Sequence, residues 1–156
     1  MAKLFRRILV PYDFSPPAAR ALKVAAGLAA ENRGRLDVLH VVIPVPPMTG
    51  FPVAESGAFI PPADMVEGAR RSLERAVARA VGKKGPRATC RVVIGNPLQR
   101  IIAAARGADV IVMATTGRTG FSHLLIGSVA EKVVRHAPIP VLTVRTGARS
   151  ARRRRS

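Results

Sequence analysis

The chain has 156 residues and a mass of 16.6 kDa, which suits one compact domain rather than two. Hydrophobic types make up 48% of it and charged types 22%, so it can bury a core and is not globally disordered. Lys and Arg number 26 against 9 acidic residues, and this formal net charge of +17 favours anionic partners.

Several classes of protein are excluded by the same inspection. Cys90 is the single cysteine, which rules out an internal disulfide and a thiolate metal site. No apolar run is long enough to span a membrane, and the apolar stretch behind the basic N-terminus is too short for a signal peptide. We therefore expect a cytoplasmic protein with no membrane association.

The C-terminal end of the chain differs in composition from the rest. Residues 145–156 hold six arginines and no acid, and without them 20 basic residues still face nine acidic ones, a net charge of +11. We expect one folded domain over residues 1–146 and a basic, disordered tail over residues 147–156. An alternative role for the tail is salt-sensitive binding of nucleic acid or an acidic protein, without base stacking because no aromatic residue lies among the arginines.

Short apolar runs alternate with longer amphipathic patterns along the rest of the chain. Strands are expected at residues 8–10, 36–43, 88–94, 109–114 and 141–144. Helices are expected at residues 16 to about 32, about 66 to 80, 97 to about 106 and 128 to about 136. Residues 44–62 hold six prolines and no usable period, which predicts a long loop.

Three helix starts carry a capping signal. Ser15 precedes two prolines, and Asn96 precedes Pro97, an arrangement typical of an N-cap followed by a first-turn proline. Ser128 with Glu131 three residues later has the spacing of a capping box.

The alternation of strands and helices predicts the fold class. Strands that are apolar throughout, separated by amphipathic helices, indicate an open, doubly wound, parallel α/β sheet of five strands with helices on both faces. Such sheets bind ligands beyond the carboxyl ends of their strands. The expected site therefore lies among residues 11–13, the turn after Val42, and residues 114–127.

The segment after the fourth expected strand, ATTGRTGFSHLLIGS at residues 114–128, has the character of an anion-binding loop. Its glycines allow sharp turns and close approach of an anion to the backbone, and Gly127-Ser128 stands at a helix start, which favours phosphate. Arg118 adds a charge, although the segment has neither a Walker nor a dinucleotide-binding pattern. The same residues are also compatible with plain turn glycines and a helix cap without a ligand.

Residues 109–145, DVIVMATTGRTGFSHLLIGSVAEKVVRHAPIPVLTVR, resemble the C-terminal signature of the universal stress protein family. Residues 8–22, ILVPYDFSPPAARAL, and residues 39–42 resemble its first two strands, and residues 95–97 resemble the turn before its third helix. The likeness covers about residues 6–145. It implies a five-stranded α/β fold, commonly dimeric, and, in nucleotide-binding members, an ATP site.

That ATP site has the pattern Gly-x-x-Gly, nine residues, Gly-[Ser/Thr]. Its second glycine corresponds to Gly117 and its closing pair to Gly127-Ser128, with the required spacing between them. The first glycine is replaced by Ala114. An added methyl obstructs wherever backbone and ligand approach closely, so this departure concerns affinity rather than fold.

The resemblance also implies which residues contact the nucleotide. They are Pro11, Tyr12, Asp13, Val41, Met113, Ala114, Thr115, Thr116, Gly117, Arg118, Thr119, Gly120, Gly127, Ser128, Val129 and Ala130. Asp13 would contact the base or ribose, and Val41 would contact the adenine. The loop at residues 115–120 and the helix start at residues 128–130 would bind the phosphates, together with Mg²⁺. A cap on the following helix is the alternative role for Asp13.

No other residues indicate catalysis. His40 is expected to be a hydrogen-bonded interior residue, and no catalytic triad, nucleophile elbow or metal-ligand spacing occurs. We expect at most slow ATP hydrolysis, and a stress-response regulator that binds an adenine nucleotide and dimerises through its last strand. The alternatives are a nucleotide-free dimeric interaction module, favoured by Ala114, and a basic protein that associates with nucleic acid.

Overall fold

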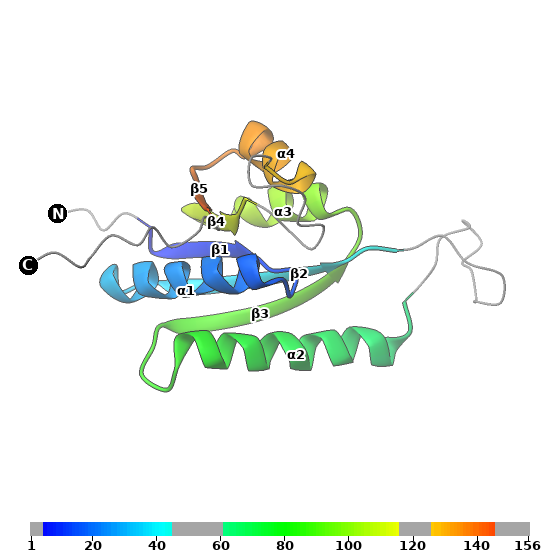
Figure 1. Ribbon diagram of the computed structural model, residues 1–156, viewed down its shortest axis with the longest axis horizontal. Helices are drawn as coiled ribbons and strands as arrows, with labels where there is room; N and C mark the ends of the chain where they lie inside the picture. The colour runs from blue at the N-terminus through cyan, green and yellow to red at the C-terminus, as the bar shows by residue number, and fades with distance from the viewer. Residues whose placement is uncertain (1–4, 45–60, 116–125, 146–156) are drawn as a thin grey trace, which may run out of the picture.

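A five-stranded parallel sheet forms the centre of the molecule (Figure 1). The computed structural model describes residues 5–44, 61–115 and 126–145. The elements in chain order are β1 (Arg7–Pro11), α1 (Pro16–Glu31), β2 (Arg35–Val42), α2 (Ala63–Val81), β3 (Arg87–Ile94), α3 (Pro97–Ala105), β4 (Val110–Ala114), α4 (Ser128–His136) and β5 (Val141–Val144). The strand order is β3-β2-β1-β4-β5 and every pairing is parallel, which confirms the predicted fold class.

The helices cover the two faces of the sheet in pairs, as Figure 1 shows. On one face, α1 and α2 pack Leu22 and Leu73 onto Ile8 and Val10 of β1. On the other face, α3 and α4 pack Ile101 and Val133 onto the alternate residues of β1 and β4. Because successive residues of a strand point to opposite faces, a strand segment buried on both sides must be apolar throughout, as residues 8–11 of β1 and the whole of β4 are.

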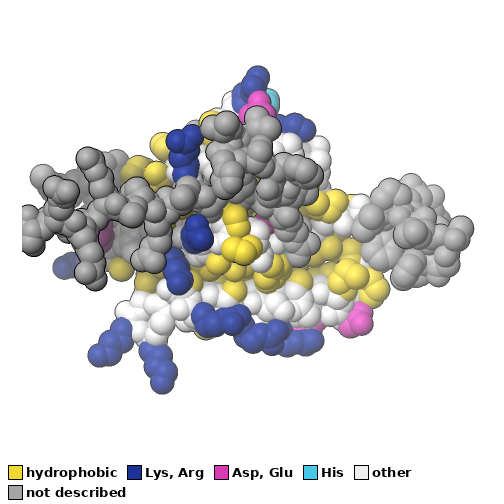
Figure 2. All heavy atoms as spheres, viewed as in Figure 1, with side chains coloured by type: hydrophobic (Ala, Val, Ile, Leu, Met, Phe, Trp, Pro, Cys, Tyr) yellow, Lys and Arg dark blue, Asp and Glu magenta, His cyan; other side chains and the backbone are white. Residues whose placement is uncertain are grey.

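The amphipathic pattern of α2 is confirmed by its burial. Leu73 and Val77 are buried against the sheet, whereas Arg71 and Arg75 are exposed. Figure 2 shows Lys and Arg side chains gathered along the outer margin of α2. The described part of the chain contains no helix that is long and apolar enough to cross a membrane.

Two of the three predicted helix caps are confirmed. The Ser15 side chain accepts a hydrogen bond from the Ala18 amide at 3.2 Å, and the Asn96 side chain accepts one from the Gln99 amide at 3.2 Å. Prolines follow both caps in the first turn, where a missing N–H breaks no intrahelical bond. These local signals set the starts of α1 and α3.

The capping box predicted at Ser128 and Glu131 is wrong. The N-cap of α4 is Gly127, one residue earlier, so Ser128 is the first residue inside the helix and has no capping role. Glu131 consequently lies one position too far into the helix for a capping box, and its carboxylate pairs instead with Arg135 at 2.9 Å. Among the described residues no side chain caps the start of α4.

Element boundaries differ slightly from those expected. The second strand begins at Arg35 and ends at Val42, the fourth begins at Val110, and the second helix runs from Ala63 to Val81. The expected loop at 44–62 falls mostly on residues 45–60, which lie outside the described residues, as does the predicted tail at 147–156.

Candidate functional site

The strand order reverses between β1 and β4. From β1 the chain continues outward through β2 and β3, and it then returns to place β4 on the other side of β1 and β5 beyond it. The carboxyl ends of β1 and β4, at Pro11 and Ala114, therefore lie at the same edge of the sheet, on the strands where the crossovers diverge. In open parallel sheets this is the point at which helices leave room for a ligand.

The chain turns sharply after β1. The Tyr12 amide donates to the Leu39 carbonyl at 2.8 Å, the Tyr12 carbonyl oxygen contacts His40 Nδ1 at 2.7 Å, and Phe14 has a left-handed backbone with φ 64°. The ring of Phe14 packs edge-on against those of Tyr12 and His40, with centroids 5.3 and 4.7 Å away. His40 is thus hydrogen-bonded, as predicted, although it is half-buried rather than interior. Burial raises the pKa of the Tyr12 hydroxyl, and Asp13 adds to the rise while Arg79 opposes it.

Asp13 organises the start of α1 without being its cap. Its Oδ1 accepts hydrogen bonds from the Ser15 amide at 3.0 Å and from the Ser15 hydroxyl at 2.5 Å. The hydroxyl in turn accepts the bond from Ala18, so the carboxylate holds the capping serine in place. The alternative role expected for Asp13, a cap on this helix, is therefore wrong: Ser15 is the N-cap, and Asp13 supports it through Oδ1.

The residue before α4 lies beside the residue that follows β4. The Gly127 amide donates to the Thr115 carbonyl at 2.6 Å, and the Thr115 amide donates to Val144 of β5 at 3.2 Å. The tip of β4 is therefore joined to the start of α4 and to the end of β5. This closure places the first turn of α4 at the carboxyl edge of the sheet, beside the end of β4.

The start of α4 exposes backbone donors at this edge. The first intrahelical bond runs from the Glu131 amide to the Gly127 carbonyl at 2.9 Å, so the amides of residues 128–130 have no partner within the helix. Ser128 and Val129 are exposed, and Ala130 is buried. Because Glu131 pairs with Arg135, its carboxylate is neutralised by a neighbour. These amides have no partner within the helix and no side-chain cap among the described residues, and together with the helix dipole they favour an anion here.

The remaining predicted residues divide into three groups. Met113 is buried, and Val41 is half-buried against the same α3–α4 core. Ala114 is half-buried and pairs with Val144 of β5. Five predicted residues lie outside the described residues: Thr116, Gly117, Arg118, Thr119 and Gly120.

The described residues contain no group of three or more His, Cys, Asp and Glu that could hold a metal ion. Sequence reasoning also missed the aromatic contacts of Phe14 and a basic hollow at the opposite edge of the sheet. The signal for the hollow was present, because Arg7, Arg35 and Arg87 each stand immediately before an apolar strand. Strand register, which decides whether they meet, cannot be read from their sequence positions.

Most of the chain matches one sequence family. The model of the family described as "Universal stress protein family" matches residues 4–145. The chain belongs to the universal stress protein family. It is 40% identical over 148 residues to a universal stress protein of Thermus aquaticus, with 91% of this chain and 100% of the relative covered.

Solved structures of family members have the same fold. The universal stress protein of Archaeoglobus fulgidus, solved in complex with dAMP, superposes with a TM-score of 0.65 at 23% identity and covers 90% of this chain and 98% of its own. A universal stress protein in complex with cAMP superposes with a TM-score of 0.65 at 22% identity and covers 92% of this chain and 99% of its own. At these identities the likeness establishes the fold that this family member shares with them.

Proposed function

We propose that this protein is an ATP-binding regulator of the stress response and that its nucleotide lies at the carboxyl edge of the sheet, between β1 and β4. The observation that carries the proposal is the uncapped start of α4, which the Gly127–Thr115 hydrogen bond places beside the end of β4. Two structural neighbours, solved with dAMP and with cAMP, support an adenine nucleotide as the ligand class.

In this proposal the phosphates bind to backbone amides rather than to a lysine. The amides of residues 128–130 donate to phosphate oxygens, together with residues 115–120 of the loop. Gly127 has φ −58° and ψ 148°, a conformation open to any residue, so its backbone shape does not require glycine. The absence of a side chain at 127 therefore fits a close approach of the ligand.

The base and ribose lie against the ends of β1 and β2. Val41 and Pro11 are half-buried and offer apolar surface to the adenine, with buried Met113 in the same α3–α4 core as Val41 and Tyr12 in the α1–α2 core. Asp13 reaches the ribose through Oδ2, since Oδ1 already accepts two hydrogen bonds from Ser15. Each contact leaves the hydrogen bonds that hold the start of α1 unchanged.

Mg²⁺ would reach this site with the triphosphate. Among the described residues no acidic or imidazole cluster is present to bind it, so the phosphates would supply most of its ligands. A regulator rather than a metabolic enzyme is the function that these residues support. A cytoplasmic location completes the proposal, and it suits the half-buried free thiol of Cys90.

A second copy of the chain would bind along β5. This strand is at the edge of the sheet, and its Leu142 is 42% exposed. An unpaired edge with an exposed apolar side chain favours pairing with an identical strand. Binding of nucleic acid or an acidic protein through residues 147–156 is a separate proposal, tested by removing residues 148–156 and measuring how DNA retention depends on salt.

Mass spectrometry of gently purified protein tests the proposed function directly. Co-purified adenine nucleotide, released on unfolding, would exclude the nucleotide-free module that Ala114 favours. The second step is titration with labelled ATP of the natural protein, of Gly127→Val, and of Gly68→Val as a matched control on α2, where an added Cβ meets no atom within 4 Å. We expect only Gly127→Val to lose binding; equal, weak binding in all three proteins would refute the proposal.

A further inference from the structure

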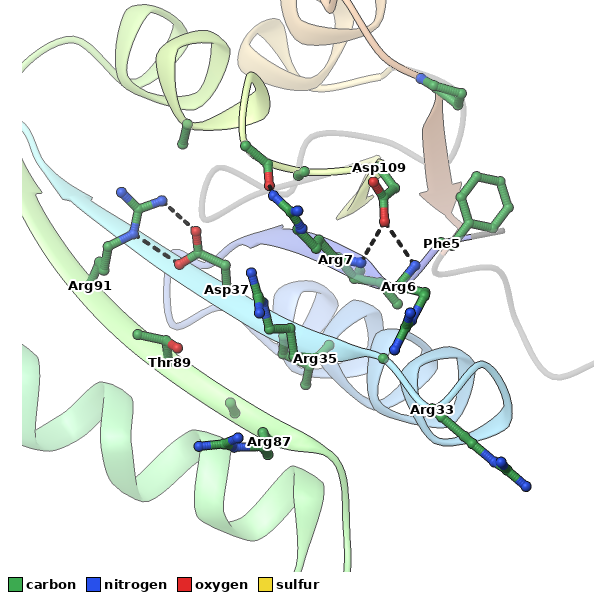
Figure 3. Close-up of a pocket in the computed structure, with 18 of the residues that line it drawn as sticks. Phe5, Arg6, Arg7, Arg33, Arg35, Asp37, Arg87, Thr89, Arg91 and Asp109 are labelled. Atoms are coloured by element: carbon green, nitrogen blue, oxygen red, sulfur yellow. Dashed lines mark hydrogen bonds and ion pairs between the residues drawn. The ribbon is translucent and has the colours of Figure 1, made fainter. Parts of the chain in front are cut away.

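An open hollow of about 1460 Å³ lies at the amino ends of the strands, at the edge opposite the proposed nucleotide site (Figure 3). Its floor is the start of β1, β2 and β3, and one wall is the end of α3, with Ala103, Ala104 and Gly107. These small residues leave room above the strands. The lining side chains that could contact a ligand are mostly arginines: Arg6, Arg7, Arg33, Arg35, Arg87 and Arg91.

Strand register brings three of these arginines into one row. Arg7 pairs with Arg35 across β1 and β2, and Arg35 pairs with Arg87 across β2 and β3. Residues in register on parallel strands share a face of the sheet, and neighbouring strands lie about 4.8 Å apart, so the three arginine side chains leave the same face from adjacent strands. Like charges placed opposite each other on neighbouring strands destabilise a sheet unless a counter-charge is present.

The two carboxylates that line the hollow, those of Asp37 and Asp109, already accept hydrogen bonds from other groups. Asp37 forms a two-bond pair with Arg91, at 2.9 Å to Nε and 2.5 Å to the terminal nitrogen, as the dashed lines in Figure 3 show. Asp109 accepts hydrogen bonds from the backbone amides of Arg6 and Arg7 at 2.9 and 2.7 Å. Asp37 is therefore paired outside the row formed by Arg7, Arg35 and Arg87, and Asp109 can offset at most one of its three charges.

Helix dipoles do not supply the missing negative charge. Six arginines and two aspartates give the lining a net charge of +4. The helices α1, α2 and α3 end just before β2, β3 and β4, so their C-termini lie at this edge with about half a negative charge each. Their sum, about −1.5, leaves a clear positive excess, and an arginine cannot shed its charge by deprotonation.

We propose that this hollow, the arginine groove, binds a chain of linked phosphate groups. Guanidinium groups bind phosphate through paired N–H donors, and a row of three across the sheet matches a ligand with several phosphates in succession. Phe5 is the one aromatic residue among the described lining, and it packs against the α1–α2 core. Without a ring on which a base could stack, the groove recognises phosphate rather than a nucleotide base.

Calorimetric titration with tripolyphosphate tests the arginine groove. Arg35→Gln/Arg87→Gln removes two charges from the row, whereas Arg20→Gln/Arg75→Gln removes two charges from exposed positions on α1 and α2. We expect the groove variant to weaken binding at least about tenfold and the control to change it by less than about twofold. Arg35→Lys/Arg87→Lys should bind more tightly than the glutamine variant, because it keeps the charge, and less tightly than the natural protein, because it loses the paired donors.

Two further arms separate this groove from other sites and ligands. Gly127→Val, which blocks the proposed nucleotide site, should leave the arginine-dependent binding of tripolyphosphate unchanged. Single-stranded oligothymidylate with the same number of phosphates should bind more weakly than tripolyphosphate. Equal tripolyphosphate affinity in the groove and control variants would overturn the proposal, as would tighter, arginine-dependent binding of the oligonucleotide.

Thermal unfolding at low salt provides a second readout of this binding, because a ligand that binds the folded protein raises its unfolding midpoint. Tripolyphosphate should raise the unfolding midpoint of the natural protein more than that of Arg35→Gln/Arg87→Gln, because it relieves the repulsion along the row. Raising the salt from about 50 to about 200 mM should weaken the binding and shrink this difference. An equal rise in both proteins would contradict a role for the row.

Discussion

An aspartate at position 128 should stabilise the protein and weaken nucleotide binding at the same time. Ser128 is exposed in the first turn of α4, so the substitution requires no repacking. A carboxylate at this position interacts favourably with the uncapped amides and the helix dipole, which is worth about 0.3–1 kcal/mol. We therefore expect the free energy of unfolding of Ser128→Asp to rise by that amount.

The same carboxylate would repel a phosphate bound at the start of α4. Two unit charges about 4 Å apart repel by about 1 kcal/mol in water and about 4 kcal/mol at the effective dielectric constant of a protein surface. The dissociation constant for ATP should therefore rise between about fivefold and about a thousandfold. Ser128→Asn introduces a side chain with nearly the shape of aspartate but no charge, so it should change the dissociation constant for ATP by less than about threefold.

Denaturant unfolding and calorimetric titration of the three proteins measure both effects. The informative result is their opposite sign, because a general disturbance of α4 would lower stability and affinity together. If Ser128→Asp bound ATP as tightly as Ser128→Asn, the phosphates would not lie at the start of this helix. If it were less stable than the natural protein, α4 would not begin with free amides.

The remaining predictions concern the ionisation of Tyr12 at alkaline pH, the edge strand β5, and Gly34 at the amino edge of the sheet. Tyr12 is the one tyrosine of the chain, so an ultraviolet titration reports its hydroxyl alone. The raised pKa should place the midpoint of the folded protein above 10, and unfolding, which removes the burial, should lower that midpoint. The contribution of Tyr12 to stability is full below the unfolded pKa and is lost as the pH rises through the folded one. Light scattering should find Leu142→Lys monomeric and the matched Val24→Lys, at a similarly exposed position on α1, unchanged; a dimeric Leu142→Lys would exclude β5 as the interface. Gly34→Ala should cost about 1–3 kcal/mol in chemical denaturation, because a Cβ there would stand 2.7 Å from the carbonyl oxygen of Arg6; an unchanged midpoint would show that this backbone contact yields freely.

Local sequence determined the order of the elements and two of the helix starts. The apolar runs of β1 and β4 have to be buried on both faces, and amphipathic segments between them leave a parallel sheet as the consistent arrangement. Ser15 and Asn96 cap their helices through side chains that reach only three residues along the chain. The sequence also directed attention to the carboxyl ends of β1 and β4, since the fold class alone places a site there.

Contacts between distant residues required the tertiary structure. The Ser128–Glu131 pattern predicted a cap, but the start of α4 is set by the bond between Gly127 and Thr115, which depends on where β4 ends.

The arginines at positions 7, 35 and 87 show the same limit most clearly. Each is an ordinary charged residue before a strand when read along the chain. Their side-by-side placement depends on a register between three strands, and a shift of one residue would send one of them to the opposite face. Sequence fixes what each strand buries, whereas the charge that accumulates between strands is decided by how they align.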